Sequence, residues 1–192
     1  EEANPAPSWV QLSYLHNELG RALDNAGLYE KALEHFQKAL AIVLKQLGPE
    51  HPSVASSYNN IGSMHLEKGE YDKALEHFQK ALAIDLKQLG PEHPDVATSY
   101  HSIGEVHRKK DEYDKALELY QKALAIKLKK LGPEHPYLVT SYHSMALVYK
   151  AKKDLAKAKE YWEKAYAICL KKLGTNHPST KIVKGRLDAL KE

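Results

Sequence analysis

Apolar residues recur along the chain in two alternating helical stretches. Residues 53–68 carry a stripe at the i, i+3, i+4, i+7 spacing of an amphipathic helix, formed by Val54, Tyr58, Ile61, Gly62 and His65. Residues 71–89 carry a second stripe, formed by Tyr71, Ala74, Leu75, Phe78, Ala81, Leu82 and Leu86. Gly90 and Pro91 then stop the second helix, because glycine suits a helix end and proline cannot continue one. The connection around Gly69 is very short, so the pattern predicts two antiparallel helices.

The same pair of helices is predicted four times, because the sequence repeats every 42 residues. The segment GEYDKALEHFQKALAIDLKQLGPEHPDVATSY begins at Gly69, and related copies begin at Gly27, Asp111 and Asp154. A His-Pro pair marks each copy, at His51, His93, His135 and His177. A period of about 20–50 residues is typical of stacked units that form a solenoid.

We therefore predict an all-α, right-handed solenoid. Its parts are a flexible leader over residues 1–8, four helix-turn-helix units over about residues 9–51, 52–93, 94–135 and 136–177, and a capping helix over residues 178–192. The last segment suits a cap because Ile182, Val183 and Leu187 form an apolar face while its other side is charged. At the start of a unit's first helix, Ser53 or the equivalent Asp95 is expected to cap the helix or to complement its dipole.

Small and aromatic residues each keep one position in the repeat. The small ones, in the first helix of each unit, are Gly20, Gly62, Gly104 and Ala146. Glycine inside a helix costs about 1 kcal/mol relative to alanine, so its recurrence predicts a close approach of the two helix backbones. The aromatic ones, in the second helix, are Phe36, Phe78, Tyr120 and Trp162. We expect them to fill the core between one second helix and the next unit.

Charge and composition argue against several classes of protein. The net charge is +3 at pH 7 without a run of like charges, which disfavours nucleic acid and membrane surfaces as partners. Acidic residues prevail in the first half and basic residues in the second, which indicates either a binding preference or a solvated lysine-rich end. The single cysteine, Cys169, is expected to be buried and inert. With no apolar run of membrane-spanning length, we expect a cytoplasmic protein.

Eleven histidines raise the question of metal binding or catalysis. The His-Pro histidines occur once per repeat, too far apart to share a zinc ion, whose ligands lie about 2 Å from it. We expect them to stabilise turns. We expect His35 and His77 on the surface, and His101 and His143 in a binding groove. No HExxH, GxSxG or glycine-rich phosphate loop occurs, so the sequence predicts no enzyme, no cofactor and no metal site.

One set of positions, formed by Tyr58, Ile61, Gly62, Ala74, Phe78 and Ala81, resembles the tetratricopeptide repeat pattern. The longer second helix and the loops LGPEHPDVA and LGPEHPYLV closely resemble the 42-residue units of kinesin light chains, over about residues 9–178. The resemblance implies that the first helices of the units line a concave groove. In kinesin light chains this groove holds an extended cargo peptide with a tryptophan among acidic residues. An asparagine near the middle of each first helix holds the peptide backbone.

The resemblance assigns a row of candidate peptide-binding residues to the first helices. The asparagine position is occupied by Asn17, Asn59, His101 and His143. One turn further along lie Arg21, Ser63, Glu105 and Leu147, followed by Leu66, Arg108 and Lys150. Arg108, Lys109 and Lys150 are expected to add positive charge toward the second half of the groove, which favours an acidic peptide. The alternative for Lys109 and Lys150 is that they complement the dipole at the end of their helix.

The sequence therefore predicts a monomeric adaptor or scaffold, without catalytic activity, that binds a linear acidic peptide of another protein. A tryptophan-acidic cargo peptide is the leading candidate. The alternative is a structural or self-associating repeat module, including an engineered consensus array, because the second and third copies are very alike.

Overall fold

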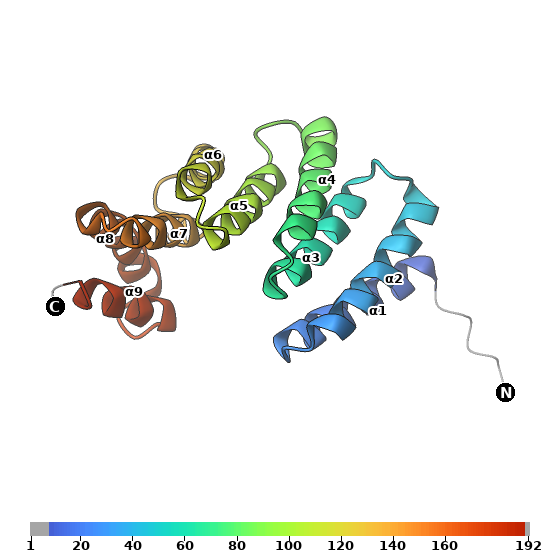
Figure 1. Cartoon of the computed structure of the whole chain (residues 1–192), viewed down its shortest axis with the longest axis horizontal. Coiled ribbons are helices and arrows are strands. Elements are labelled where there is room, and N and C mark those ends of the chain that lie inside the picture. Colours follow the sequence, from blue (N-terminus) through green and yellow to red (C-terminus); the bar gives the residue numbers. More distant parts are fainter. Residues whose placement is uncertain (1–7, 191–192) are drawn as a thin grey trace. The chain divides into compact units, whose positions relative to one another are not determined.

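The computed structural model describes residues 8–190, so most of the predicted leader and the end of the predicted cap lie outside the described residues. The described part contains nine α-helices and no strand (Figure 1). In chain order these are α1 (Trp9–Asn25), α2 (Tyr29–Leu47), α3 (Pro52–Glu67), α4 (Tyr71–Leu89), α5 (Pro94–Lys109), α6 (Tyr113–Leu131), α7 (Leu138–Ala151), α8 (Leu155–Leu173) and α9 (Pro178–Asp188).

The helices pair in chain order, as the periodicity predicts. Helix α1 packs on α2, α3 on α4, α5 on α6 and α7 on α8. The chain divides between Pro91 and Glu92 into two compact units, the first with α1–α4 and the second with α5–α9. Within the first unit α2 also packs on α3; within the second, α6 packs on α7 and α8 on α9. Each unit therefore contains two complete helix pairs, and α9 follows the last of them.

Three of the four His-Pro histidines, His51, His93 and His177, cap helices, which gives their predicted role in turns an atomic basis. The Nδ1 atom of His51 accepts a hydrogen bond from the backbone N–H of Ser53 at 3.1 Å, and His93 and His177 each accept the N–H two residues further on at 3.2 Å. Ser53 and Asp95 are therefore not the N-caps, because the histidine before the proline occupies that position. Asp95 lies in the first turn of α5, where its charge suits the helix dipole, the other role expected of it. Proline then fits the first helical position, where no N–H is needed.

The recurring glycines make room for aromatic rings. A Cβ atom added at Gly62 would lie 2.8 Å from the Phe78 ring, and one added at Gly104 would lie 2.7 Å from the Tyr120 ring. The predicted close approach is therefore between a glycine and a ring of the same repeat, not mainly between two backbones. The aromatic residues also reach the next repeat, because Phe36 clusters with Ile61 and Met64 of α3. Such dense packing leaves no space for a further side chain.

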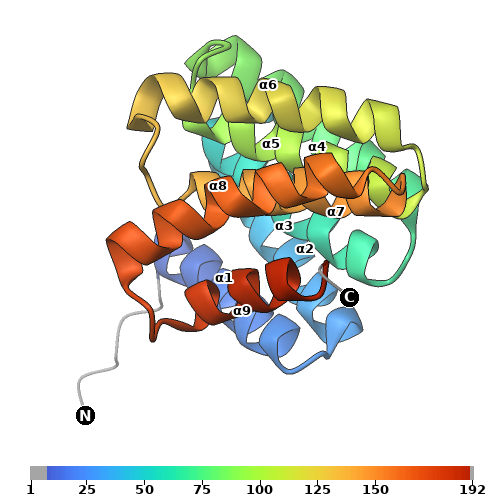
Figure 2. The ribbon, with the colours of Figure 1, turned by 90° about the vertical axis from the view of Figure 1, so that its left-hand side faces the viewer.

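The first and last described helices, α1 and α9, begin close to their predicted first residues. Ser8, which we assigned to the leader, is the N-cap of α1: its hydroxyl accepts the Gln11 N–H, and the Gln11 side chain accepts the Ser8 N–H. Helix α9 lies along α8 (Figure 2). It buries Thr180 and Val183 and joins the cluster around Trp162 and Cys169. The predicted burial of Cys169 is confirmed, and burial raises the pKa of its thiol.

Candidate functional site

The predicted row lies on α1 and α3 in the first unit. Asn17 is half-buried and Arg21 is exposed on α1, while Asn59, Ser63 and Leu66 are half-buried on α3. The Asn60 amide, next to the predicted Asn59, donates to the Asn17 side-chain oxygen at 3.5 Å. A polar contact therefore links α1 and α3 at the asparagine position.

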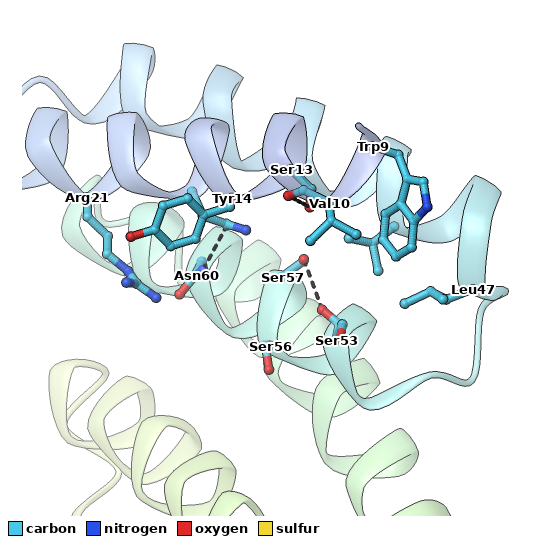
Figure 3. Close-up of a pocket in the computed structure, with 12 residues that line it drawn as sticks. Trp9, Val10, Ser13, Tyr14, Arg21, Leu47, Ser53, Ser56, Ser57 and Asn60 are labelled. Carbon is cyan, nitrogen blue, oxygen red and sulfur yellow. Dashed lines mark hydrogen bonds between the residues drawn. The ribbon is translucent and has the colours of Figure 1, made fainter. Parts of the chain in front are cut away.

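A pocket of about 340 Å³ opens between α1, α3 and the end of α2 (Figure 3). Arg21, Tyr14 and Asn60 lie toward one end of it, and Trp9 and Leu47 toward the other (Figure 3). Its remaining lining residues are Val10, Ser13, Asn17, Val43, Ser53, Ser56 and Ser57. The pocket thus has an apolar end and an end with an amide and a guanidinium group.

Serine hydroxyls form much of the polar wall of this pocket. The hydroxyl of Ser57 donates to the Ser53 carbonyl oxygen at 3.0 Å, and the hydroxyl of Ser13 donates to the Val10 carbonyl oxygen at 3.1 Å. These hydroxyl protons are used within their own helices, as serine in a helix commonly does. The charged donor of the pocket is Arg21, whose only ion pair within residues 8–190 is with exposed Glu18 at 2.7 Å. Exposed pairs of this kind contribute little free energy, so Arg21 can change partner at low cost.

The predicted row has a different character in the second unit, where Glu105 is the centre of a polar network. One carboxylate oxygen of Glu105 accepts hydrogen bonds from the Tyr120 hydroxyl at 2.6 Å and the Ser144 hydroxyl at 2.7 Å. The other accepts two N–H groups of Arg108, at 2.7 and 3.0 Å. The network joins α5, α6 and α7. It holds both Glu105 and Arg108 within the protein.

Burial and hydrogen bonding shift the pKa values of this network in opposite directions. Burial raises the pKa of Glu105, but the bonds from Tyr120, Arg108 and Ser144 outweigh burial and hold that pKa below its usual value. Burial and the nearby cations Lys127 and Arg108 lower the pKa of His101 to about 4. Glu105 is therefore charged and His101 neutral at neutral pH. The buried Nδ1 atom of His101 has no hydrogen-bond partner within residues 8–190.

The fourth repeat places its predicted residues in three environments. The Nδ1 atom of His143 accepts a hydrogen bond from the Trp162 indole N–H at 3.1 Å. Leu147 packs against the cluster around Trp162, and Lys150 is exposed on α7. His143 and Leu147 thus help to hold α7 against α8, whereas Lys150 faces solvent.

The sequence did not identify most of the pocket. Asn17 and Arg21 were predicted and line it, but Trp9, Tyr14 and Asn60 were not among the predicted site residues. A signal existed in the alignment of the repeats: Trp9 stands where later repeats have histidine, and Tyr14 stands where they have serine or threonine. These departures add apolar surface in the first repeat alone.

Two histidines expected on the surface are half-buried instead. The Nδ1 atom of His35 lies 3.0 Å from the Nδ1 atom of His16, and the His77 ring stacks on the His65 ring with 5.2 Å between centroids. The expectation was wrong because this side of the second helix lies against the first helix of its own repeat. In the described part of the chain no three His, Cys, Asp or Glu side chains are placed to hold a metal ion.

Comparison with known proteins places the chain in a family. The tetratricopeptide repeat model matches residues 11–87, 53–129 and 95–171, in overlapping copies. The chain belongs to the tetratricopeptide repeat family. None of the curated proteins compared with it matches. Tetratricopeptide repeats are typical of protein–protein interaction scaffolds. None of the helices within residues 8–190 is apolar over the length that a membrane span requires.

Solved structures support the predicted solenoid class and the kinesin light chain resemblance. A Podosopora anserina protein described as a kinesin light chain with nearly identical TPR-like repeats shares 30% identity, with a TM-score of 0.75. The alignment covers 93% of this chain and 85% of that one, and a single-substitution variant of that protein gives a TM-score of 0.76 with the same identity and coverage. BtubC (BKLC) from P. vanneervenii is similar in fold alone, with 24% identity, a TM-score of 0.75 and coverage of 92% of this chain and 70% of that one.

Proposed function

We propose that this tetratricopeptide repeat protein is a non-enzymatic adaptor that binds an extended peptide of another protein in the pocket between α1 and α3. One observation carries the proposal: Asn17 and Arg21 line the same pocket as the exposed aromatic residues Trp9 and Tyr14. An extended peptide needs anchors for its side chains and partners for its backbone. The pocket combines both kinds of group.

The chemistry of the pocket favours an apolar residue next to an acidic one in the bound peptide. A large apolar side chain fits the end formed by Trp9 and Leu47, both of which are more than a third exposed. A carboxylate of the peptide then replaces Glu18 on Arg21, with which it can form a two-pronged hydrogen bond. The amides of Asn17 and Asn60 are placed for the peptide backbone. A tryptophan-acidic peptide, as bound by kinesin light chains, meets these requirements.

For the second unit we propose a narrower role. Glu105 and Arg108 are engaged with each other, and Glu105 also with Tyr120 and Ser144, so we expect them to shape the surface of α5 and α7 instead of binding the peptide directly. Lys150 is exposed and adds positive charge on α7.

We expect the protein to be cytoplasmic and monomeric. Sedimentation at several concentrations will test whether it is a monomer.

Titration with a fluorescent tryptophan-acidic peptide tests the pocket. We expect Arg21→Glu to weaken binding at least about tenfold, because it replaces an attraction with a repulsion, and Asn17→Ala and Asn59→Ala to weaken it less. Lys38→Glu is the matched control: it makes the same charge change on an exposed site of α2 outside the pocket. Equal weakening by Arg21→Glu and Lys38→Glu would show that only net charge matters. Full affinity in Arg21→Glu would rule the pocket out.

A further inference from the structure

Two histidines of the first repeat turn the same ring atom toward each other. His16 of α1 and His35 of α2 place their Nδ1 atoms 3.0 Å apart, with 5.1 Å between the ring centroids. Both residues are half-buried. One Nδ1 atom carries the proton of the hydrogen bond between them, and the other offers its lone pair. The sequence did not predict this contact, because the two residues lie on different helices and meet only when these helices pair.

The later repeats show that helix packing does not require a histidine pair at this place. The position of His16 is occupied by tyrosine in all three, at Tyr58, Tyr100 and Tyr142. The position of His35 is occupied by His77, Leu119 and Tyr161. Rings at these two positions are in contact in the second and fourth repeats, with centroids 5.9 Å apart for Tyr58–His77 and 6.2 Å apart for Tyr142–Tyr161. The first repeat alone combines two imidazole rings at these positions.

A second histidine pair in the same unit has a different geometry. The rings of His65 and His77 stack with 5.2 Å between centroids. The Nδ1 atom of His65 lies 2.7 Å from a carboxylate oxygen of Glu70, and that of His77 lies 2.8 Å from the Lys73 carbonyl oxygen. Both partners are acceptors, so each of these Nδ1 atoms donates a proton and offers no lone pair. Nearness of two histidines is therefore not enough, and His16 and His35 differ in that their nitrogens converge.

The distance between the Nδ1 atoms of His16 and His35 suits two ligands of one metal ion. Zinc binds imidazole nitrogen at about 2.0–2.1 Å, so two such nitrogens at the tetrahedral angle lie about 3.3 Å apart. The observed separation of 3.0 Å is close to that value. Binding an ion requires both Nδ1 lone pairs. The donor ring therefore moves its proton to its Nε2 atom, and two neutral rings release no net proton.

The surroundings of the pair keep His16 neutral and place one cation near it. Burial, His35 and Lys38 lower the pKa of His16, so the neutral ring, which is the form that binds metal ions, prevails at neutral pH. Lys38 is exposed and lies three residues after His35 on α2. Its charge opposes a metal ion, although its long side chain can extend into solvent. Reversing this charge should therefore strengthen metal binding.

We propose that His16 and His35 together bind one divalent transition-metal ion of the class that prefers imidazole ligands. Within residues 8–190 no group of three His, Cys, Asp or Glu side chains is placed to hold a metal ion, so water completes the coordination of this one. The ion links α1 to α2 and stabilises the folded first repeat. Neither histidine lines the proposed peptide pocket, so the two sites are separate.

Isothermal titration calorimetry of the full, untagged and chelator-treated chain with zinc tests the site. We expect one ion per chain to bind with the highest affinity. Copper(II) should bind more tightly than zinc, whereas magnesium, which prefers oxygen ligands, should not bind there. Zinc should also raise the midpoint of thermal unfolding, because a ligand that binds the folded form stabilises it.

Substitutions taken from the other repeats locate the ion. His16→Tyr installs the residue of the later repeats, and His35→Leu installs the residue of the third. Each should weaken zinc binding at least about tenfold, because the ion loses one of its two protein ligands. His77→Leu is the matched control: it makes the same change at the equivalent position of the second repeat and should leave the zinc affinity unchanged. Circular dichroism checks that each variant is folded.

A gain of affinity tests the same site independently of these losses. Lys38→Glu replaces the nearby cation with a carboxylate and should tighten zinc binding at least about tenfold, because it turns a repulsion into an attraction. Three outcomes would overturn the proposal. These are full zinc affinity in His16→Tyr, equal weakening by His35→Leu and His77→Leu, and weaker binding by Lys38→Glu. The first two would place the zinc on other histidines of the chain.

Discussion

The same register position behaves in opposite ways in the two units. Ser63 of α3 donates its hydroxyl to the Asn59 carbonyl oxygen of its own helix at 3.0 Å. Glu105, 42 residues later on α5, accepts hydrogen bonds from Arg108, Tyr120 of α6 and Ser144 of α7. The side chain at this position thus bonds only within its own helix in Ser63, whereas in Glu105 it connects three helices.

Two differences between the repeats produce this contrast: Glu105 stands where the first unit has Ser63, and Tyr120 stands where it has Phe78. Phe78 fills the space beside Gly62 in the first unit, and Tyr120 fills the same space beside Gly104 in the second. Tyr120 has a hydroxyl group that Phe78 lacks, and this hydroxyl donates a hydrogen bond to the Glu105 carboxylate. In a repeat protein, side-chain substitutions can therefore turn a residue of the surface row into part of an internal hydrogen-bond network while the helices stay the same. Polar character alone does not show that a residue of the row is available for a peptide.

The largest effect is expected for Glu105→Ala. It leaves Arg108, Tyr120 and Ser144 without their common acceptor. Glu105 and Arg108 are half-buried, so we expect a loss greater than the about 1.5–3 kcal/mol that a single hydrogen bond to a charged group contributes. Ser63→Ala, at the same register position, should cost less than about 0.5 kcal/mol. Urea unfolding of both variants measures the difference. Similar losses in both would refute the contrast between the two units.

The next effect is expected for Tyr120→Phe, which removes one donor but leaves Arg108 and Ser144 on the carboxylate. A hydrogen bond to a charged group contributes about 1.5–3 kcal/mol, so the free energy of unfolding should fall by that amount. Tyr113→Phe is the control, because its hydroxyl binds the exposed Asp111 at 2.7 Å and should contribute much less. If the two variants are equally stable, the link from Tyr120 to Glu105 is not important.

The pH dependence of unfolding tests the lowered pKa of His101. The folded protein keeps its pKa at about 4, below the usual 6.5, so the unfolded chain binds a proton first as the pH falls. Stability attributable to His101 is therefore present above about pH 6.5 and is lost as the pH falls toward 4. Thermal unfolding between about pH 7 and pH 5 should depend less on pH in His101→Asn, which installs the residue found at Asn17 and Asn59. An unchanged pH dependence would mean that His101 does not titrate in this way.

The smallest effect is expected on the solvent-facing side of the second helices. Lys80 pairs with Glu76 at 2.6 Å, with both side chains about half exposed. Lys80→Ala should lower the free energy of unfolding by only about 0.2–0.5 kcal/mol, as should Lys122→Ala in the second unit. Because this surface is alike in both units, a large difference between the two variants would show that the units differ beyond their first helices.

The sequence by itself determined the helices, their pairing, the period of 42 residues and the closing helix. Hydrophobic periodicity, glycine and proline are local signals, and they determine where a helix begins and ends. For example, the second helix of the second repeat is predicted over residues 71–89 and is observed as α4 (Tyr71–Leu89). The repeat pattern also identified Asn17 and Arg21 as members of a surface row.

Only the tertiary structure decided what the polar residues of that row do. Glu105 and Ser63 look equally available in the sequence, yet the partners of Glu105 come from helices 15 and 39 residues away. The pocket likewise depends on Trp9, Asn60 and Leu47, which come from three helices. Burial and hydrogen bonding depend on neighbours that are distant in the chain, whereas helix formation depends on neighbours within a few residues.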